Sequence, residues 1–443
     1  MMRISLSDHF NYRKLLWFAL PSVIMMVFTS LYSIVDGFFI SNYVGKTPFA
    51  AVNLIMPVIM ILGSVGFMFG AGGSALVSMT MGTGEHDKAQ RLFSLFIYCT
   101  VIGGAVIAAV VFVFIRPIAE LFGAEGALLD NCVLYGRILL ASLPFFMLQF
   151  EFQSFFITAE KPQLGLVITL ISGVTNIVLD ALFVAVFSWG LVGAAVATAV
   201  SQVLGGIIPV IYFCRPNTSL LRLTRTKFDG NALLKACTNG SSELMSNIST
   251  SIVSMLYNVQ LMKYAGENGI AAYGVLMYIN MIFLGVFIGY STGTAPVVSY
   301  HYGAGNHDEM RGLLKRSLVI IGFSAAGTFV VAELLAKPLA GIFVSYDKEL
   351  MAMTIRAFRI YSFSFLFASV AVYGSSFFTA LNDGLTSALI SFLRTLLFQI
   401  GAVLILPVFF GIDGIWFSVV VAELASAIMT VLFIISKRKR YHY

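Results

Sequence analysis

The sequence predicts an all-α polytopic membrane protein with twelve transmembrane helices, arranged as two six-helix lobes related by a pseudo-two-fold axis along the membrane normal. Composition is the first observation: 59% of the 443 residues are hydrophobic and 11% are charged, whereas soluble domains carry about 25% charged residues. The mean hydropathy of +0.92 is the second. The third is an internal repeat, because the second half of the chain matches the first at a constant offset of 221 residues.

The expected helices follow one another along the chain as long apolar segments. Roughly 20 apolar residues cross the hydrocarbon core of a bilayer. The first segment is too long for a cleavable signal peptide, so we expect it to remain as a membrane helix. The twelve expected helices are 15–40, 51–79, 92–115, 133–157, 164–187, 190–213, 233–262, 270–300, 313–335, 355–380, 385–408 and 412–436.

The repeat supports this division into two halves. Gly84 matches Gly305, and Arg116-Pro117 matches Lys337-Pro338, and further pairs obey the same offset. Six helices in each repeat is an even number, so both halves have the same orientation, with a substrate path expected between them. We expect an amino-terminal lobe at 1–213, a basic cytoplasmic linker at 214–231 and a carboxy-terminal lobe at 232–443.

Lysine and arginine predict the orientation in the membrane. Eighteen of them lie in the loops on the side that holds both termini, and five lie on the opposite side. The excess of positive charge marks the cytoplasmic side, so both termini are expected in the cytoplasm.

Two acids in the first half are candidates for an ion site. Asp36 lies roughly 7–8 Å and Asp180 roughly 10 Å from the outer ends of their helices, and therefore at similar depth. Asn176 lies one turn from Asp180 on the same face, and Thr198 is expected at the same level. Two carboxylates, an amide and a hydroxyl would bind a proton or a small cation, and they would be metal ligands if that cation is Na⁺.

The repeat provides an internal comparison for this site. The positions 221 residues later hold Tyr257, Leu397, Gly401 and Val419. The scaffold is therefore duplicated and the polar cluster is not. This asymmetry favours a function over a structural hydrogen-bond pair, which remains an alternative.

With these residues, the chain resembles the multidrug and toxic compound extrusion (MATE) family, in its bacterial and archaeal branches. The resemblance covers nearly the whole chain. It implies that Pro21 is the helix-bending proline of the first helix, and that Asp36, Asn176, Asp180 and Thr198 form an amino-lobe cation site. Some members also carry an acid in the tenth helix. This chain has none between Arg359 and Asp383, which makes coupling through the second lobe less favoured, although Glu243 leaves it open.

Other residues are assigned to an expected substrate cavity. Glu243, Tyr257 and Glu423 could line it and attract a cationic substrate, or the two acids could form local hydrogen bonds to neighbouring helices. Glu151 and Glu333 lie near helix ends, and we expect them to be interfacial.

The leading hypothesis is a secondary active antiporter that exports organic cations or drugs in exchange for inward H⁺ or Na⁺. The alternative is a lipid-linked oligosaccharide flippase of the same superfamily. An enzyme is disfavoured, because no intramembrane protease motif and no nucleotide-binding loop occurs in the sequence. We expect no cofactor, no nucleic-acid partner, and a monomer in the plasma (inner) membrane of a prokaryote.

Overall fold

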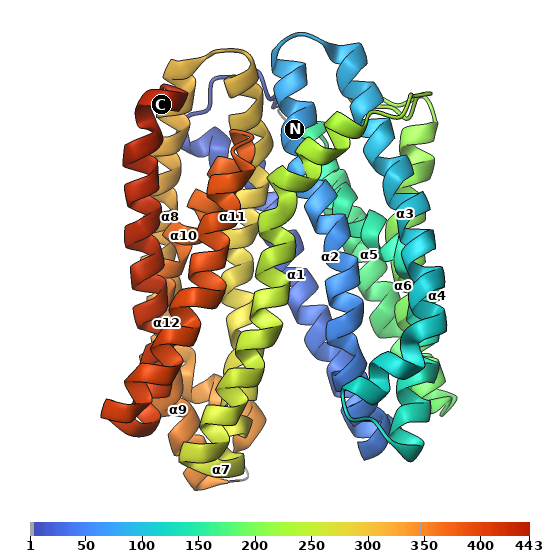
Figure 1. The fold of residues 1–443 in the computed structure, drawn as a ribbon, viewed down its shortest axis with the longest axis vertical. Helices are drawn as coiled ribbons and strands as arrows, with labels where there is room; N and C mark the ends of the chain where they lie inside the picture. The colour runs from blue at the N-terminus through green and yellow to red at the C-terminus, as the bar shows by residue number, and fades with distance from the viewer. Residues whose placement is uncertain (1–3, 346) are drawn as a thin grey trace. The chain divides into compact units, whose positions relative to one another are not determined.

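The computed structural model describes residues 4–345 and 347–443, and helices dominate them (Figure 1). The first half holds α1 (Tyr12–Phe39), η1 (Ile40–Val44), α2 (Lys46–Gly82), α3 (His86–Leu121), α4 (Gly126–Thr158), α5 (Pro162–Asp180), η2 (Ala181–Val186) and α6 (Gly190–Cys214). The second half holds α7 (Gly230–Gly303), α8 (His307–Val344), α9 (Lys348–Ser362), α10 (Phe365–Ala380), α11 (Gly384–Phe392), η3 (Leu393–Leu397) and α12 (Phe398–Tyr441). The segments labelled η are short π-helices.

Nine helical stretches of the described chain are long and apolar enough to cross a membrane, and the bent pair α9 and α10 forms a tenth. Two of these stretches contain two spans each. As one straight rod, the 74 residues of α7 would extend about 110 Å, several times the hydrocarbon thickness. Figure 1 shows α7 turning back on itself. The turn lies at Gly266 (φ 60°), and the same break occurs in α12 at Gly411 (φ 59°).

These breaks follow the offset of 221 residues. Gly45, Gly84 and Gly190 have positive φ angles in the first half, and so do their matches Gly266, Gly305 and Gly411. Glycine reaches this backbone region without the steric cost that a Cβ would bring. The repeat inferred from the sequence is therefore present in the backbone as well.

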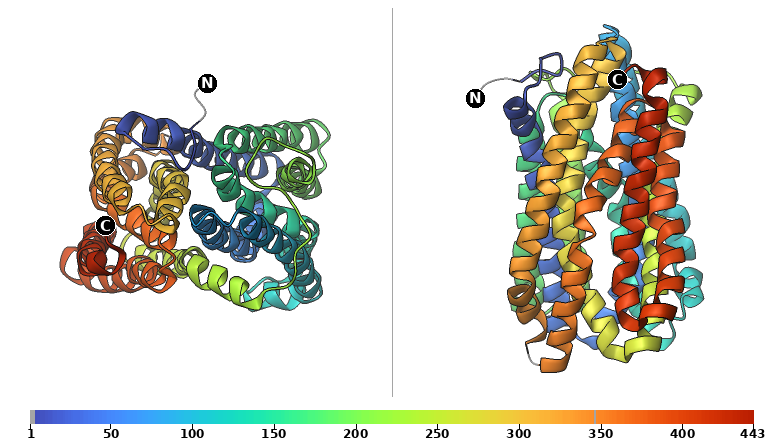
Figure 2. Two further views of the ribbon diagram at one scale, coloured as in Figure 1. Left: turned by 90° about the horizontal axis from the view of Figure 1, so that it is seen from above. Right: turned by 90° about the vertical axis from the view of Figure 1, so that its left-hand side faces the viewer.

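The chain forms two compact units, of which the first comprises Met1–Leu6 and Phe28–Gly240. In this unit α4 packs against α2, α3, α5 and α6, and the view from above shows them end-on as one bundle (Figure 2). Small residues bring α2 close to α4: a Cβ on Gly66 would lie 2.2 Å from the carbonyl oxygen of Met147. Small residues allow such a close approach between membrane helices.

The second unit comprises Ser7–Val27 and Ser241–Tyr443. Its members include the first half of α1, because Gly289 of α7 lets the helices approach: a Cβ there would lie 2.6 Å from the Cα of Val23. α8, α9, α11 and α12 pack around α10. Helix α1 is thus divided between the units, and the lobe boundaries expected at 1–213 and 232–443 stay a prediction.

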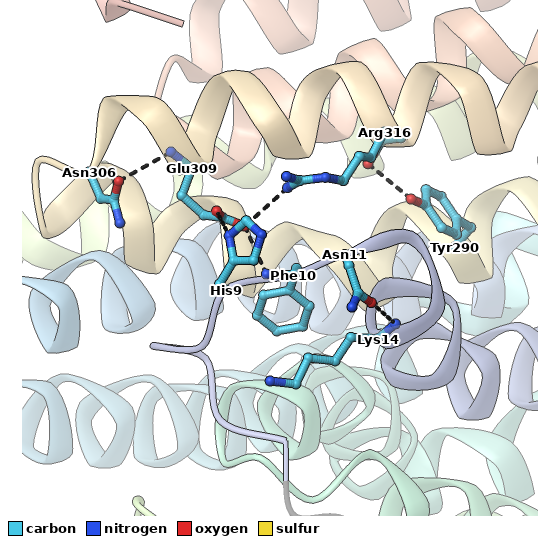
Figure 3. Close-up of polar contacts among 9 residues, drawn as sticks. His9, Phe10, Asn11, Lys14, Tyr290, Asn306, Glu309 and Arg316 are labelled. Atoms are coloured by element: carbon cyan, nitrogen blue, oxygen red, sulfur yellow. Dashed lines mark hydrogen bonds and ion pairs between the residues drawn. The ribbon is translucent and has the colours of Figure 1, made fainter.

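The segment before α1 is anchored on Glu309 of α8 (Figure 3). The backbone N–H of Phe10 donates to its Oε1 at 2.9 Å, and His9 Nδ1 lies 2.5 Å from its Oε2. Arg316 donates to the same carboxylate at 3.3 Å. The contacts of His9 and Phe10 therefore fix the start of α1 within the second unit, and Arg316 of α8 holds the carboxylate that receives them.

Candidate functional site

Four helices of the first unit bring the predicted ion-site residues together. Asp36 lies near the end of α1, Asn176 and Asp180 in the last turns of α5, and Thr198 in α6. The fourth helix, α4, adds Tyr135, whose side chain is within electrostatic range of both carboxyl groups. The two carboxyl groups are themselves close enough to interact.

The backbone changes its helical type beside both acids. Asp180 is the last residue of α5, and the π-helix η2 follows it directly. The π-helix η1 follows α1 shortly after Asp36, and η1 and η2 contact each other and α6. π-helical turns occur often at functional sites, because they redirect side chains within a helix.

Burial leaves these acids with unused hydrogen-bonding capacity. Asp180 is fully buried and Asn176 is 1% exposed. Among the described residues, neither carboxylate oxygen of Asp180, nor Oδ1 of Asp36, nor Nδ2 of Asn176 has a hydrogen-bond partner. Two adjacent carboxylates repel each other when both are ionised, and unpaired charge is costly in a dry site. The arrangement therefore favours an added proton or cation.

The remaining polar groups at the site are hydroxyls. Thr198 Oγ1 donates to the carbonyl of Ala194 at 3.0 Å, so its lone pairs remain available to a ligand. Tyr135 donates weakly to Met56 Sδ at 3.8 Å and lies beside Thr198. No cluster of three His, Cys, Asp or Glu side chains occurs within residues 4–345 and 347–443. Two carboxylates with neutral oxygens suit a proton or a hard cation rather than a transition metal.

Tyr135 was not predicted from the sequence. It is one of several aromatic residues in an apolar helix, so its type alone gives no signal. The repeat could have identified it, because the position 221 residues later is Arg356. A mismatch between aligned positions of the two halves is the same signal that favoured a function for Asp36 and Asp180.

In the second unit, the expected cavity residues Glu243 and Glu423 lie around Arg394, which was not predicted from the sequence. Arg394, in η3, donates from Nε to both carboxylate oxygens of Glu423, at 3.1 and 2.8 Å. Glu243 is within electrostatic range of the same guanidinium. The negative charge of Glu423 is therefore already matched within this cluster.

Tyr257 occupies the position that matches Asp36 in the first repeat. Its hydroxyl donates to Gln399 Oε1 at 2.8 Å, and its ring stacks on Tyr273 with centroids 5.3 Å apart. The residue is 1% exposed. Where the first unit has an acid, the second has a hydrogen-bonded aromatic residue.

Two further acids and the proline were also assigned from the sequence. The side chain of Glu151 is fully buried within the first unit, and its expected position near the membrane interface stays a prediction. Glu333 is partly exposed and accepts from Ser362. Helix α1 continues through Pro21 without interruption, so the bending role stays a prediction.

The fold and the site together define a class: a duplicated, all-helical membrane protein with a buried acidic site, which is the construction of many secondary transporters. The MatE family model matches residues 21–182 and 244–404, one segment in each half and most of the chain. The chain belongs to the MatE family.

Individual relatives agree with this assignment. The multidrug export protein MepA of Staphylococcus haemolyticus is 24% identical over 430 residues, which cover 97% of this chain and 94% of the relative. A crystal structure of a MATE protein in complex with MaL6 has a TM-score of 0.93 at 22% identity, with 98% of both chains covered. The outward-facing conformation of a multidrug resistance MATE family transporter has a TM-score of 0.92 at 22% identity and covers 98% of this chain and 97% of that one. These likenesses confirm the expected fold class.

Proposed function

We propose that this protein is a secondary active antiporter of the plasma membrane that exports organic cations in exchange for inward H⁺ or Na⁺. One observation carries the proposal: the first unit encloses two neighbouring carboxyl groups, Asp36 and Asp180, which are close enough to share a proton with each other and whose buried oxygens receive no hydrogen bond from any other side chain of the described residues. Such a pair binds a cation readily, and binding reduces the net negative charge of the two carboxylates. Asn176, Thr198 and Tyr135 would supply the neutral ligands.

The proposed substrate class follows from the charge of the second unit. Glu243, Glu423 and Arg394 carry a net charge of −1 when ionised, beside the stacked rings of Tyr257 and Tyr273. A single negative charge next to aromatic faces suits a flat, monovalent organic cation. The names of the curated relatives, multidrug export proteins, support this class over the lipid-linked oligosaccharide flippase.

The proposed cycle uses an ion gradient and no bound cofactor. An ion can drive export only as far as its affinities for two conformations differ. Binding at Asp36 and Asp180 changes the charge at the end of α1, and α1 is the helix divided between the two units. Ion binding would therefore shift the equilibrium between forms of α1 and expel the substrate.

The test is efflux of a fluorescent organic cation from proteoliposomes under separately imposed H⁺ and Na⁺ gradients. Asp36→Asn and Asp180→Asn are expected to abolish gradient-driven efflux while the protein still folds. Asp130→Asn is the matched control in the same unit, because this exposed acid pairs with Arg116 at the surface. Wild-type efflux rates in both site variants would disprove the assignment.

A further inference from the structure

A groove opens on the surface of the first unit, between α3, α4 and α6. Helix α4 packs against both of the other helices (Figure 1), and the groove has a volume of about 560 Å³. Its two longer walls are each one helix face, because the lining residues are spaced by four and three: Leu134, Ile138 and Ala141 on α4, and Val196, Val200 and Val203 on α6. Apart from Arg137 and Ser142, the lining side chains are apolar.

The charge in this lining is the guanidinium of Arg137, an exposed residue of α4. Its Cζ lies 4.9 Å from the centroid of the Phe112 ring. Among the residues that the structure describes, no carboxylate pairs with this guanidinium and no acceptor takes a hydrogen bond from it. Arg137 also lies four residues inside the expected membrane span 133–157, where an unpaired charge is unfavourable. A cation on the membrane-facing surface is thus left without an anion.

The second half of the chain supplies such an anion itself. The position 221 residues after Phe112 is Glu333. Ile138, the neighbour of Arg137, matches Arg359 at the same offset, and Arg359 Nε lies 4.0 Å from Oε2 of Glu333. In the first unit an aromatic ring takes the place of this acid. The arginine of the first unit therefore lacks an internal counter-ion at the place where the second unit has one.

The arginine lies near the outer end of the groove. Helix α4 starts at Gly126, on the side expected to face outward, and Arg137 follows eleven residues later, about 16 Å along the helix. From there the groove continues to Ser142 on α4 and to Leu204 on α6, both deeper in the membrane. Helical side chains lean toward the amino terminus of their helix, which for Arg137 is the outer surface. A cation above two apolar walls complements an anionic lipid of the outer leaflet.

We propose that this groove binds one anionic phospholipid of the outer leaflet, with its phosphate on the guanidinium of Arg137 and an acyl chain along α4 and α6. Guanidinium donors match phosphate oxygens in geometry, and hydrogen bonds between charged groups are stronger than neutral ones. A zwitterionic lipid carries an ammonium group beside its phosphate and therefore gains less from the arginine. The volume of the groove lies within the range of about 300–1,000 Å³ that is typical of ligand sites.

The bound lipid contacts the two helices that carry the neutral groups of the candidate ion site. Tyr135 of α4 lies two residues before Arg137 and is fully buried, and Thr198 of α6 lies between Val196 and Val200. The lipid thus covers the outer faces of the helices whose other faces bear these hydroxyls. Because it binds the folded chain, it raises the stability of the first unit.

The experiment measures the unfolding midpoint of the full chain in a nonionic detergent, with dioleoylphosphatidylglycerol or dioleoylphosphatidylcholine added at equal concentration. The anionic lipid is expected to raise the wild-type midpoint more than the zwitterionic lipid does. In Arg137→Gln the affinity for phosphatidylglycerol should fall at least about tenfold, whereas the midpoint without lipid should change little. Ala141→Phe fills the groove one turn below Arg137 and should weaken binding while the arginine stays in place.

Two controls match these variants. Arg359→Gln removes the arginine that the second unit pairs internally, and Ala105→Phe adds the same ring at an exposed position of α3 outside the groove. Both should keep the wild-type response to phosphatidylglycerol. An equal rise of the wild-type midpoint with the two lipids, or an undiminished response in Arg137→Gln or Ala141→Phe, would overturn the proposal. An equal rise with inorganic phosphate would overturn it as well, because the occupant would then be a free anion.

Discussion

The guanidinium of Arg394 and the carboxylate of Glu423 form an ion pair inside the second unit, with side chains 16 and 8% exposed. Removing one partner of a buried pair leaves an uncompensated charge, which costs about 3–5 kcal/mol. Arg394→Met is therefore expected to lower the thermal unfolding midpoint of the detergent-solubilised protein substantially, and the double variant Arg394→Met/Glu423→Met should recover most of the loss.

The control for this pair is Arg356→Met. Arg356 pairs with Asp413 but is 70% exposed, and exposed pairs contribute about 0–1 kcal/mol. An unfolding midpoint for Arg394→Met no lower than that of Arg356→Met would show that the buried pair does not stabilise the unit.

Asp383 gives a pH dependence outside the membrane spans, in the turn between α10 and α11. Burial works against its ionisation, but hydrogen bonds from Thr386 and the ammonium group of Lys437 hold the pKa of this carboxyl below its ordinary value. A lowered pKa stabilises the fold above the unfolded value of about 3.9, and this stabilisation is lost as the pH falls through the lower folded pKa.

Asp383→Asn is expected to destabilise the protein at pH 7 and to reduce the loss of stability on acidification below about pH 4. Asparagine can still accept the backbone N–H of Thr386 and cap the helix, while the charge and the acceptor for the Thr386 hydroxyl are lost. The measurement is the unfolding midpoint as a function of pH. Asp308→Asn, at a side chain 97% exposed, should follow the wild-type curve, and a superimposable curve for Asp383→Asn would contradict the assignment.

At the scale of elements, α1 connects the proposed ion site to the second unit. Pro21 lacks a backbone N–H, so the helix can bend there at lower cost than an intact ladder. Pro21→Ala should weaken the effect of the ion on substrate binding more than it weakens binding itself. Fluorescence titrations with and without the ion measure both. If substrate binding depends on the ion equally in wild type and variant, bending at Pro21 has no part in the coupling. The assignment of the carboxylate site would not be affected by that result.

The helices themselves could be predicted from apolar length, whereas their irregularities could not. The π-helix after Asp180 and the 50° bend between α9 and α10 depend on packing that no local pattern encodes. The candidate site, too, could be predicted from the sequence only in part. Depth along a helix predicted that Asp36 and Asp180 lie at the same level. Tyr135 comes from a different helix, and only the tertiary fold brings it to these two acids. In the same way, only the tertiary fold brings Arg394 to Glu423.

At the scale of the whole molecule, the offset of 221 residues is the most informative property of the sequence. It predicted the duplicated scaffold, and the glycines at 45, 84 and 190 repeat it in the backbone. Differences between the halves then favoured a function for Asp36 and Asp180 over a structural hydrogen-bond pair. The repeat does not reveal that the first half of α1 joins the second unit, because that assignment depends on the contact of Gly289 with Val23.

The linker expected at 214–231 allows a test of the orientation. Part of it is packed on α3: the N–H of Thr224 donates to Ser94 Oγ at 2.8 Å, and Leu221 is fully buried. Lys227 and Phe228 are exposed, so a protease site inserted after Lys227 should leave these contacts intact.

The positive charge of this segment predicts that it lies in the cytoplasm. Cleavage after Lys227 is therefore expected in inverted membrane vesicles and not in right-side-out ones. A second protease site inserted after Glu125, in the exposed turn between α3 and α4, should show the opposite pattern, since one span separates the turn from the cytoplasmic ends of α3 and α4. Cleavage of both sites from the same side would contradict the span count, and a reversed pattern would invert the topology.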